Sequence, residues 1–98
     1  MALEVFWSKQ ADERFDSILN YLEEKWGEQT VSLFVKKVYD IIGIIAIFPE
    51  IGTVERIDTN IRGLVVIKQI SVFYQIRENK IIILNFYDNR QRPKNKKY

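Results

Sequence analysis

The side chains that could do chemistry in this sequence are arginine, lysine, tyrosine, aspartate and glutamate, because the chain has no histidine and no cysteine. The usual general base and the commonest metal ligand are therefore missing. Disulfides, cysteine-ligated zinc and serine–histidine or cysteine–histidine nucleophile pairs are excluded as well. The scattered glycines form no phosphate-binding loop. Glu55 and Asp58 lack a third ligand for a metal ion. We therefore predict no metal ion and no other cofactor.

Basic residues and one tyrosine gather near the ends of the expected strands. Arginine pairs with phosphate and stabilises developing negative charge, and tyrosine can transfer a proton or stack on a base. Antiparallel hairpins bring strand starts and strand ends together, so these side chains could line one basic face that binds a phosphodiester backbone. The candidates for phosphate chemistry are Arg62, Arg77 and Tyr87. The candidates for holding a nucleic acid are Lys68, Arg90, Arg92 and Lys94.

A structural interpretation of the same residues stays open. Arg62 and Arg77 would then pair with surface carboxylates such as Glu55 or Glu78. Tyr87 would complete the hydrophobic core at the end of its strand. The residue types and spacings fit both the catalytic and the structural interpretation.

The charge is divided unevenly along the chain. The net charge is only +2, but residues 1–50 carry a charge of −4 and residues 51–98 carry +6. The segment from about 89 to 98 contains five cations and no acid. Such a division favours a partner of high negative charge for the second half. A solvated basic tail that keeps the domain soluble is the alternative.

Two helices are expected in the first half of the chain. Apolar residues from Ala11 to Trp26 recur at spacings of three and four, after Ser8 as N-cap and before Gly27 as C-cap. A second apolar stripe begins near residue 28 and ends before Pro49. The tight glycine connection predicts an antiparallel helical hairpin.

Strand signals precede and follow these helices. Residues 3–7 alternate as a short strand, and residues 49–60 are expected to form a loop with an optional short strand at 53–57. Three strands follow, at 64–67, 70–77 and 81–87, with a turn at 78–80 between the last two. We predict an α+β fold in which the two-helix hairpin packs on one face of a mostly antiparallel sheet.

The length of 98 residues predicts one domain over 1–98. No segment reaches the ~18 apolar residues that span a bilayer, and the N-terminus has no signal-peptide pattern. We therefore expect a cytoplasmic protein that does not bind membranes.

The order of elements and several local strings resemble the RelE/ParE toxin family of bacterial type II toxin–antitoxin systems. The resemblance covers almost the entire chain. The strings that carry it are residues 15–22, 25–27, 48–49 with Gly52, 61–66, 72–76 and 81–93.

This resemblance implies a small toxin that a cognate antitoxin neutralises by wrapping a tail over it. RelE-like members cleave messenger RNA on the ribosome, and Arg62, Arg77 and Tyr87 fall at positions similar to their cleaving set. Arg62 and Arg77 would stabilise the charged phosphate, and Tyr87 would act as acid, base or stacking platform. The leading hypothesis is therefore a metal-independent mRNA endonuclease at the ribosome.

Two alternatives accompany that hypothesis. ParE-like members poison DNA gyrase without being enzymes, and residues 64–76 contain only Lys68 as a cation, fewer than strongly cleaving members have. The net charge is also low for a ribosome binder. The last alternative is a decayed toxin that only binds an antitoxin.

Overall fold

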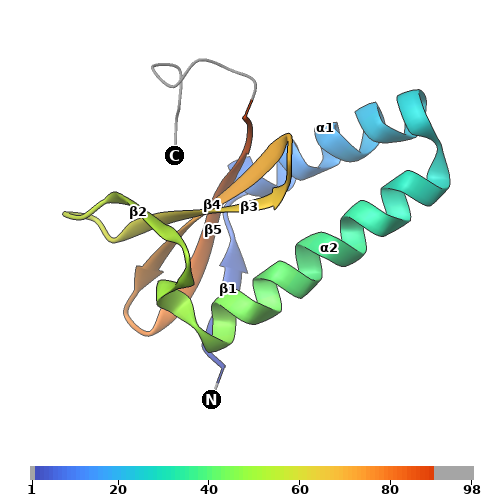
Figure 1. The fold of residues 1–98 in the computed structure, drawn as a ribbon. Coiled ribbons are helices and arrows are strands. Elements are labelled where there is room, and N and C mark those ends of the chain that lie inside the picture. The colour runs from blue at the N-terminus through green and yellow to red at the C-terminus, as the bar shows by residue number, and fades with distance from the viewer. Residues whose placement is uncertain (1, 90–98) are drawn as a thin grey trace.

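The computed structural model describes residues 2–89. A short strand, two helices and four further strands follow one another along the chain (Figure 1). The elements are β1 (Glu4–Trp7), α1 (Lys9–Trp26), α2 (Glu28–Ile47), the 3₁₀ turn η1 (Pro49–Ile51), β2 (Thr53–Arg56), β3 (Ile61–Ile67), β4 (Ile70–Arg77) and β5 (Lys80–Asp88).

The two helices form the expected antiparallel hairpin. The Ser8 hydroxyl accepts a hydrogen bond from the Ala11 N–H at 3.0 Å and donates one to the Leu84 carbonyl at 2.9 Å. The N-cap of α1 is therefore fastened to β5 as well. Gly27 joins the helices at a φ of 90°, a conformation that favours glycine. Helix α2 ends before Pro49, as the sequence predicts.

The sheet has the strand order β1-β5-β4-β3-β2. Strand β1 runs parallel to β5, and all other neighbours are antiparallel. The predicted mostly antiparallel sheet is confirmed, and the optional strand at 53–57 is β2 at one edge. The β4–β5 turn contains Glu78 and Asn79 at positive φ, which matches a tight two-residue hairpin.

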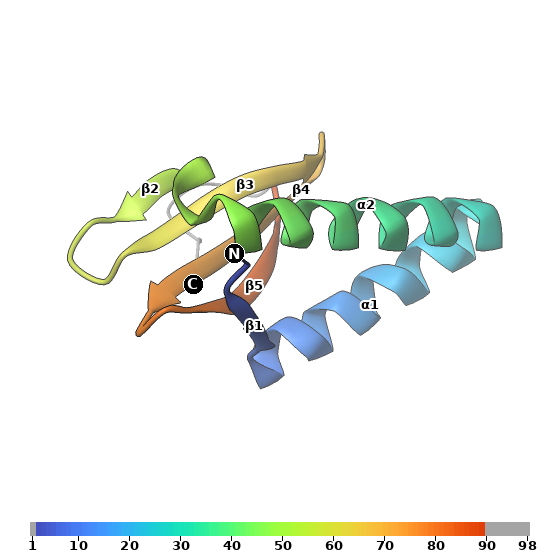
Figure 2. The same ribbon diagram turned by 90° about the horizontal axis from the view of Figure 1, so that it is seen from below.

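The helical hairpin covers one face of the sheet and extends beyond it (Figure 2). We call the face toward the helices the helix face and the opposite one the far face. The core joins Phe15, Phe34 and Ile45 of the helices to Tyr74 and Phe86 of the sheet. The rings of Phe15 and Phe86 lie 5.4 Å apart. The predicted α+β architecture, with both helices on one face, is therefore confirmed. Neither of the two described helices is long and apolar enough to cross a membrane.

Candidate functional site

Arg62 and Tyr74 together hold the corner between α2 and β2. The Tyr74 hydroxyl donates a hydrogen bond to the Pro49 carbonyl at 2.6 Å and accepts one from the Gly52 N–H at 2.9 Å. The Arg62 Nη1 donates to the carbonyls of Glu50 and Gly52 at 2.9 and 3.0 Å. Two side chains thus satisfy four backbone groups that no regular ladder satisfies at this corner.

Burial raises the pKa of the Tyr74 phenol above its ordinary value of 10.0, against the smaller lowering effects of the Gly52 amide and the Arg62 guanidinium. The phenol is therefore a neutral hydrogen-bonding group at physiological pH. It cannot serve as a general base there, because a base with so high a pKa is fully protonated. The Arg62 Nε is buried and has no hydrogen-bond partner among the described residues.

Gly52 is required at this corner by close packing. A Cβ atom at position 52 would lie 2.7 Å from the Tyr74 hydroxyl and 2.9 Å from the Gly63 carbonyl oxygen. These distances leave no room for any side chain. The match of Gly52 to the family pattern therefore has a structural reason: the corner folds tightly against Tyr74.

Tyr87 is buried in the sheet rather than exposed at its end. Its side chain is 5% exposed, and its ring meets that of Phe73 edge to face at 5.9 Å. Asn85, two residues before it, is buried as well. A ring so enclosed offers no free surface on which a base could stack.

Arg62 and Tyr87 lie on opposite faces of the sheet. Arg62 pairs with Tyr74 on β4, and Tyr87 pairs with Ser71 on the same strand. Paired residues share a face, and residues three apart on a regular strand point to opposite faces. Strand β4 is regular here, because the extra residue of the local irregularity is Leu84 on β5. The expectation of one face shared by Arg62 and Tyr87 is wrong.

Arg77 shares the far face with Tyr87 but lies at the other end of β4. It is exposed and pairs with Lys80, whereas Tyr87 pairs with Ser71 six residues along the strand. Six residues of strand span roughly 20 Å. The structure therefore brings no two of the three predicted catalytic residues together, and their catalytic roles stay a prediction.

Of the predicted nucleic-acid contacts, only Lys68 falls within the described residues. It is exposed in the β3–β4 turn, and its carbonyl accepts a hydrogen bond from the Asn89 side chain at 3.1 Å. Arg90, Arg92 and Lys94 lie outside the described residues. Among residues 2–89 there is no group of acidic residues arranged to hold a metal ion.

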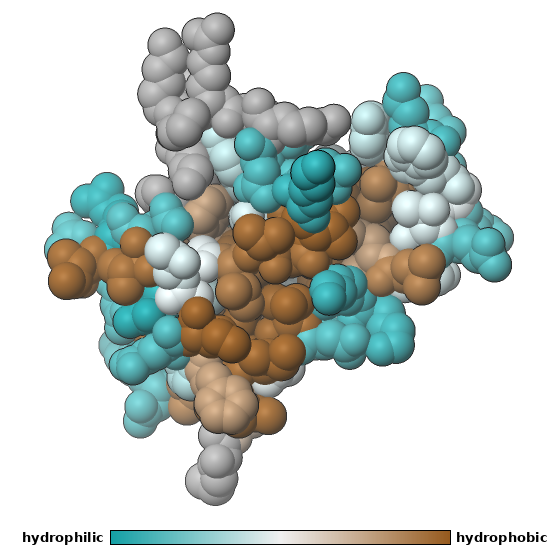
Figure 3. Space-filling view, viewed as in Figure 1, coloured by the Kyte–Doolittle hydropathy of each residue, from teal (hydrophilic) through white to brown (hydrophobic). Residues whose placement is uncertain are grey.

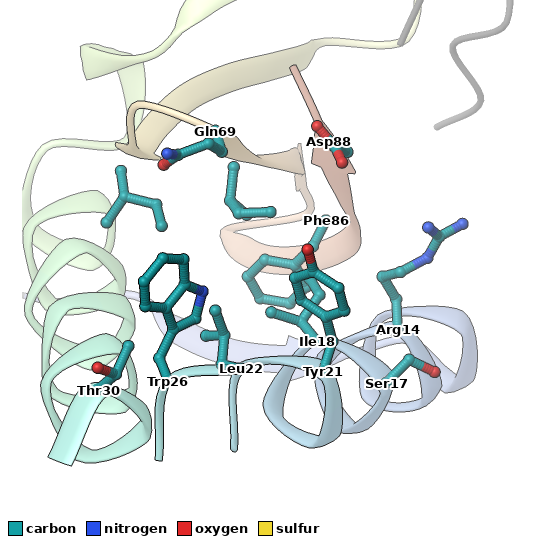
Figure 4. A pocket seen from close by; sticks show the side chains of 12 residues that line it. Arg14, Ser17, Ile18, Tyr21, Leu22, Trp26, Thr30, Gln69, Phe86 and Asp88 are labelled. Carbon is teal, nitrogen blue, oxygen red and sulfur yellow. The ribbon is translucent and has the colours of Figure 1, made fainter. Parts of the chain in front are cut away.

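A groove of about 570 Å³ opens where the helical hairpin extends past the end of the sheet. Its apolar lining includes Leu22 of α1 and Phe86 of β5, and its polar lining includes Gln69 and Asp88. In Figure 4, Trp26 rises from α1 toward the β3–β4 turn that carries Gln69, and Tyr21 rises on the side of β5. This volume lies in the range of sites that bind ligands or partner side chains.

The sequence pattern does not indicate this groove. Trp26 belongs to the apolar stripe of α1, and a stripe residue is ordinarily buried. In the structure Trp26 is 69% exposed and Tyr21 is 47% exposed. The position of Trp26 in the sequence could have indicated its exposure. An aromatic residue in the last turn of a helix, directly before the connecting Gly27, lies too far from a small core to be buried in it.

Apolar side chains also gather outside the groove. Figure 3 shows them on the face that carries the second half of α2 and the corner beyond it. Ile47, Phe48 and Ile51 contribute to this surface with exposed fractions of 55%, 62% and 49%. Exposed apolar surface of this kind is typical of proteins that bind other proteins.

Comparisons with known proteins place the chain in a family. A search of curated protein sequences gave no significant match. A solved structure described as a chromosomal ParDE TA system from P. aeruginosa matches over 89% of this chain and 96% of that one, with a TM-score of 0.74 and 13% sequence identity. That likeness shows a shared fold. The family model for the ParE toxin of the type II toxin–antitoxin system parDE matches residues 5–93. The chain therefore belongs to the ParE toxin family of type II toxin–antitoxin systems.

Proposed function

We propose that this chain is a toxin that acts by protein contact on DNA gyrase, as a ParE-like poison, and that a cognate antitoxin neutralises it. The observation that carries the proposal is the separation of Arg62 from Tyr87, which pair with β4 residues on opposite faces of the sheet. The match to the ParE toxin model over residues 5–93 supports the same choice.

Cleavage of RNA without a metal ion has strict geometric needs. A base must reach the 2′-hydroxyl, an acid must reach the leaving oxygen, and a cation must meet the phosphate, each within hydrogen-bond distance of one nucleotide. Here the Arg62 guanidinium is engaged with two backbone carbonyls, and Tyr87 is 5% exposed. We therefore assign both residues to the stability of the domain and not to a reaction.

The groove beside α1 is the surface that we assign to the antitoxin. It is bordered by the exposed rings of Tyr21 and Trp26, and its lining is mainly apolar. Such a surface suits the apolar face of a helical or extended segment from a partner protein. Occupancy of the groove would bury Trp26, the most exposed aromatic ring among the described residues.

The order in which macromolecular synthesis stops tests the proposed target. The chain is induced alone in a bacterial host, and incorporation of labelled methionine and thymidine is followed over the first minutes. We expect thymidine incorporation to fall first, because a gyrase poison stops replication before translation. An early fall in methionine incorporation with cleaved messages would contradict the proposal and restore the nuclease hypothesis.

The variant Arg77→Ala tests in the same assay whether toxicity needs this predicted catalytic arginine. Arg77 is exposed at the end of β4, so its loss should leave the fold intact. We expect full toxicity from this variant, since a protein-contact mechanism does not need an arginine at a scissile phosphate. Loss of toxicity in a folded Arg77→Ala protein would favour catalysis.

A further inference from the structure

Helix α2 carries a second stripe of residues, on the side that faces away from the core. Its core-facing side includes four large apolar residues that are buried, namely Phe34, Val38, Ile42 and Ile45. The outward stripe consists of five residues that are all exposed, namely Leu33, Lys37, Asp40, Ile44 and Ile47. Their spacing alternates between four and three residues, which is the heptad repeat of helices that pack along a seam.

The two ends of the outward stripe are apolar. Leu33 is 70% exposed at one end, and Ile44 and Ile47 are 40% and 55% exposed at the other. Apolar side chains that recur on the outer side of a helix are typical of a helix that packs against a partner. No residue of the outward stripe lines the groove beside α1, so the stripe and the groove are separate surfaces.

The middle of the outward stripe carries charges of both signs. Asp40 accepts a hydrogen bond from Lys36 at 2.9 Å, and its side chain is 58% exposed. A carboxylate has four lone-pair sites, so Asp40 can accept from a further donor. Lys37 lies one turn before Asp40 and forms no ion pair with any other residue between 2 and 89. The stripe thus presents a cation and an anion next to each other between two apolar ends.

A second α2, laid antiparallel on this stripe, meets it with complementary side chains. When Lys37 faces Asp40 of the second copy, two-fold symmetry makes Asp40 face Lys37 of the second copy. The same register places Leu33 opposite Ile44 of the second copy, again twice. A parallel pair would place Lys37 beside Lys37 and Asp40 beside Asp40, where like charges repel. The stripe is therefore complementary to itself in the antiparallel arrangement.

We propose that this protein forms a homodimer in which the α2 helices of two copies pack antiparallel through the outward stripe. The proposal goes beyond the action on gyrase, and neither depends on the other. A helix of 20 residues is about 30 Å long. One pair of such helices buries less than the roughly 800 Å² per partner of a standard stable complex. We therefore expect a weak dimer, with a Kd on the order of 10 μM.

Sedimentation velocity of the full-length protein tests whether the dimer forms. The protein is measured at total concentrations from about 0.1 to about 10 times the expected Kd. We expect the mean mass to rise with concentration, from near that of one chain towards that of two. A monomer at every concentration in this range would overturn the proposal.

Charge reversal within the stripe tests the antiparallel register. In Lys37→Glu, position 37 meets Asp40 of the second copy with like charge, and in Asp40→Lys, position 40 meets Lys37 with like charge. We expect each variant alone to dimerise with a Kd raised by at least about 10-fold. A mixture of the two variants should form a heterodimer with about the affinity of the unaltered protein, because every facing pair again has opposite signs. A mixture that fails to associate where the unaltered protein does would overturn the register.

Arg77→Glu is the control for these charge reversals. It changes the net charge by the same amount as Lys37→Glu, but at an exposed position on the far face of the sheet. We expect Arg77→Glu to dimerise like the unaltered protein, and circular dichroism checks that each variant is folded. Equal weakening by Arg77→Glu and Lys37→Glu would overturn the proposal, because net charge alone would then govern association.

Ile44→Gln separates a dimer contact from an antitoxin contact. Glutamine keeps the helix, whereas the apolar contact with Leu33 of the second copy is lost twice. We expect the Kd of the dimer to rise by about 10-fold and the affinity for the antitoxin to stay unchanged. If Ile44→Gln weakened antitoxin binding and left self-association unchanged, the outward stripe would belong to the antitoxin and the proposal would be overturned.

Discussion

At the scale of single residues, the arginine and tyrosine that the sequence offers for catalysis have structural partners instead. Arg62 donates to two carbonyls of the 49–52 corner, and Tyr87 packs against Phe73. The buried side chain of Tyr74 holds the same corner, with one hydrogen bond donated and one accepted. Because the bond from Gly52 is buried and the bond to Pro49 is partly buried, their loss leaves backbone groups without partners.

Tyr74→Phe should therefore destabilise the domain by about 1–3 kcal/mol at neutral pH, measured by urea unfolding. The exposed Tyr39→Phe is the matched control and should change stability by less than about 0.5 kcal/mol.

The loss of stability caused by Tyr74→Phe should depend on pH. The pKa of Tyr74 is higher in the folded protein than its ordinary value of 10.0, so the folded state holds this proton more tightly than the unfolded state does. Its contribution to stability is thus complete below pH 10 and is lost as pH rises through the raised pKa. The stability difference between the unaltered protein and Tyr74→Phe should shrink in urea titrations carried up to about pH 11. A stability difference that stays constant as pH rises would contradict the raised pKa of Tyr74 in the folded protein.

At the scale of elements, two glycines in and beside α2 should respond in opposite directions to the same change. A Cβ at Gly52 would meet the Tyr74 hydroxyl at 2.7 Å, whereas a Cβ at Gly43, inside α2, would meet nothing within 4 Å. Gly52→Ala should destabilise the domain by about 1–3 kcal/mol through overpacking. Gly43→Ala should stabilise it by about 0.5–1 kcal/mol, because alanine is the better helix former. Thermal unfolding of both variants checks the pair, and a stabilising Gly52→Ala would contradict the packing account.

The groove beside α1 gives the second prediction at this scale. Trp26→Ala should weaken binding of the cognate antitoxin by about 30-fold or more, as loss of an aromatic anchor at an interface does. Leu33→Ala on α2 is the control, because Leu33 is as exposed as Trp26 but does not line the groove. Calorimetric titration of each variant with the antitoxin measures both effects. Equal affinities of the two variants for the antitoxin would show that the antitoxin binds outside this groove.

The elements themselves were predictable because their signals are local. Ser8, Gly27 and Pro49 bound the two helices in the sequence, and each does so in the structure for the expected reason. The parallel pairing of β1 with β5 has no comparable local signal, because it joins residues 76 positions apart, such as Glu4 and Lys80. The grouping of Arg62 with Tyr87 failed for the same kind of reason: strand order and register decide which residues share a face.

At the scale of the whole molecule, the sequence predicted the family and the fold, but the target depends on surfaces that only the assembled structure defines. The family model covers residues 5–93, and the helices lie on one face of the sheet as expected. The groove combines residues of α1, the β3–β4 turn and β5. The position of Trp26 directly before Gly27 could have indicated its exposure, but no spacing in the sequence indicates the other residues of the groove.

The division of charge also belongs to this scale. A chain with an acidic first half and a basic second half should be attracted to a polyanion through the second half, and this attraction weakens as salt shortens the range of the field. The first half of the chain carries a charge of −4 and the second half +6, which together give the net charge of only +2.

Purified components show whether this toxin acts on DNA gyrase by contact, as we propose, or on RNA by catalysis. Gyrase, supercoiled plasmid and the toxin are mixed, and cleaved DNA is measured after denaturation of the enzyme. In parallel, ribosomes translating a defined message are exposed to the same toxin. We predict accumulation of cleaved plasmid and an intact message. A cleaved message with unaffected gyrase would contradict the account.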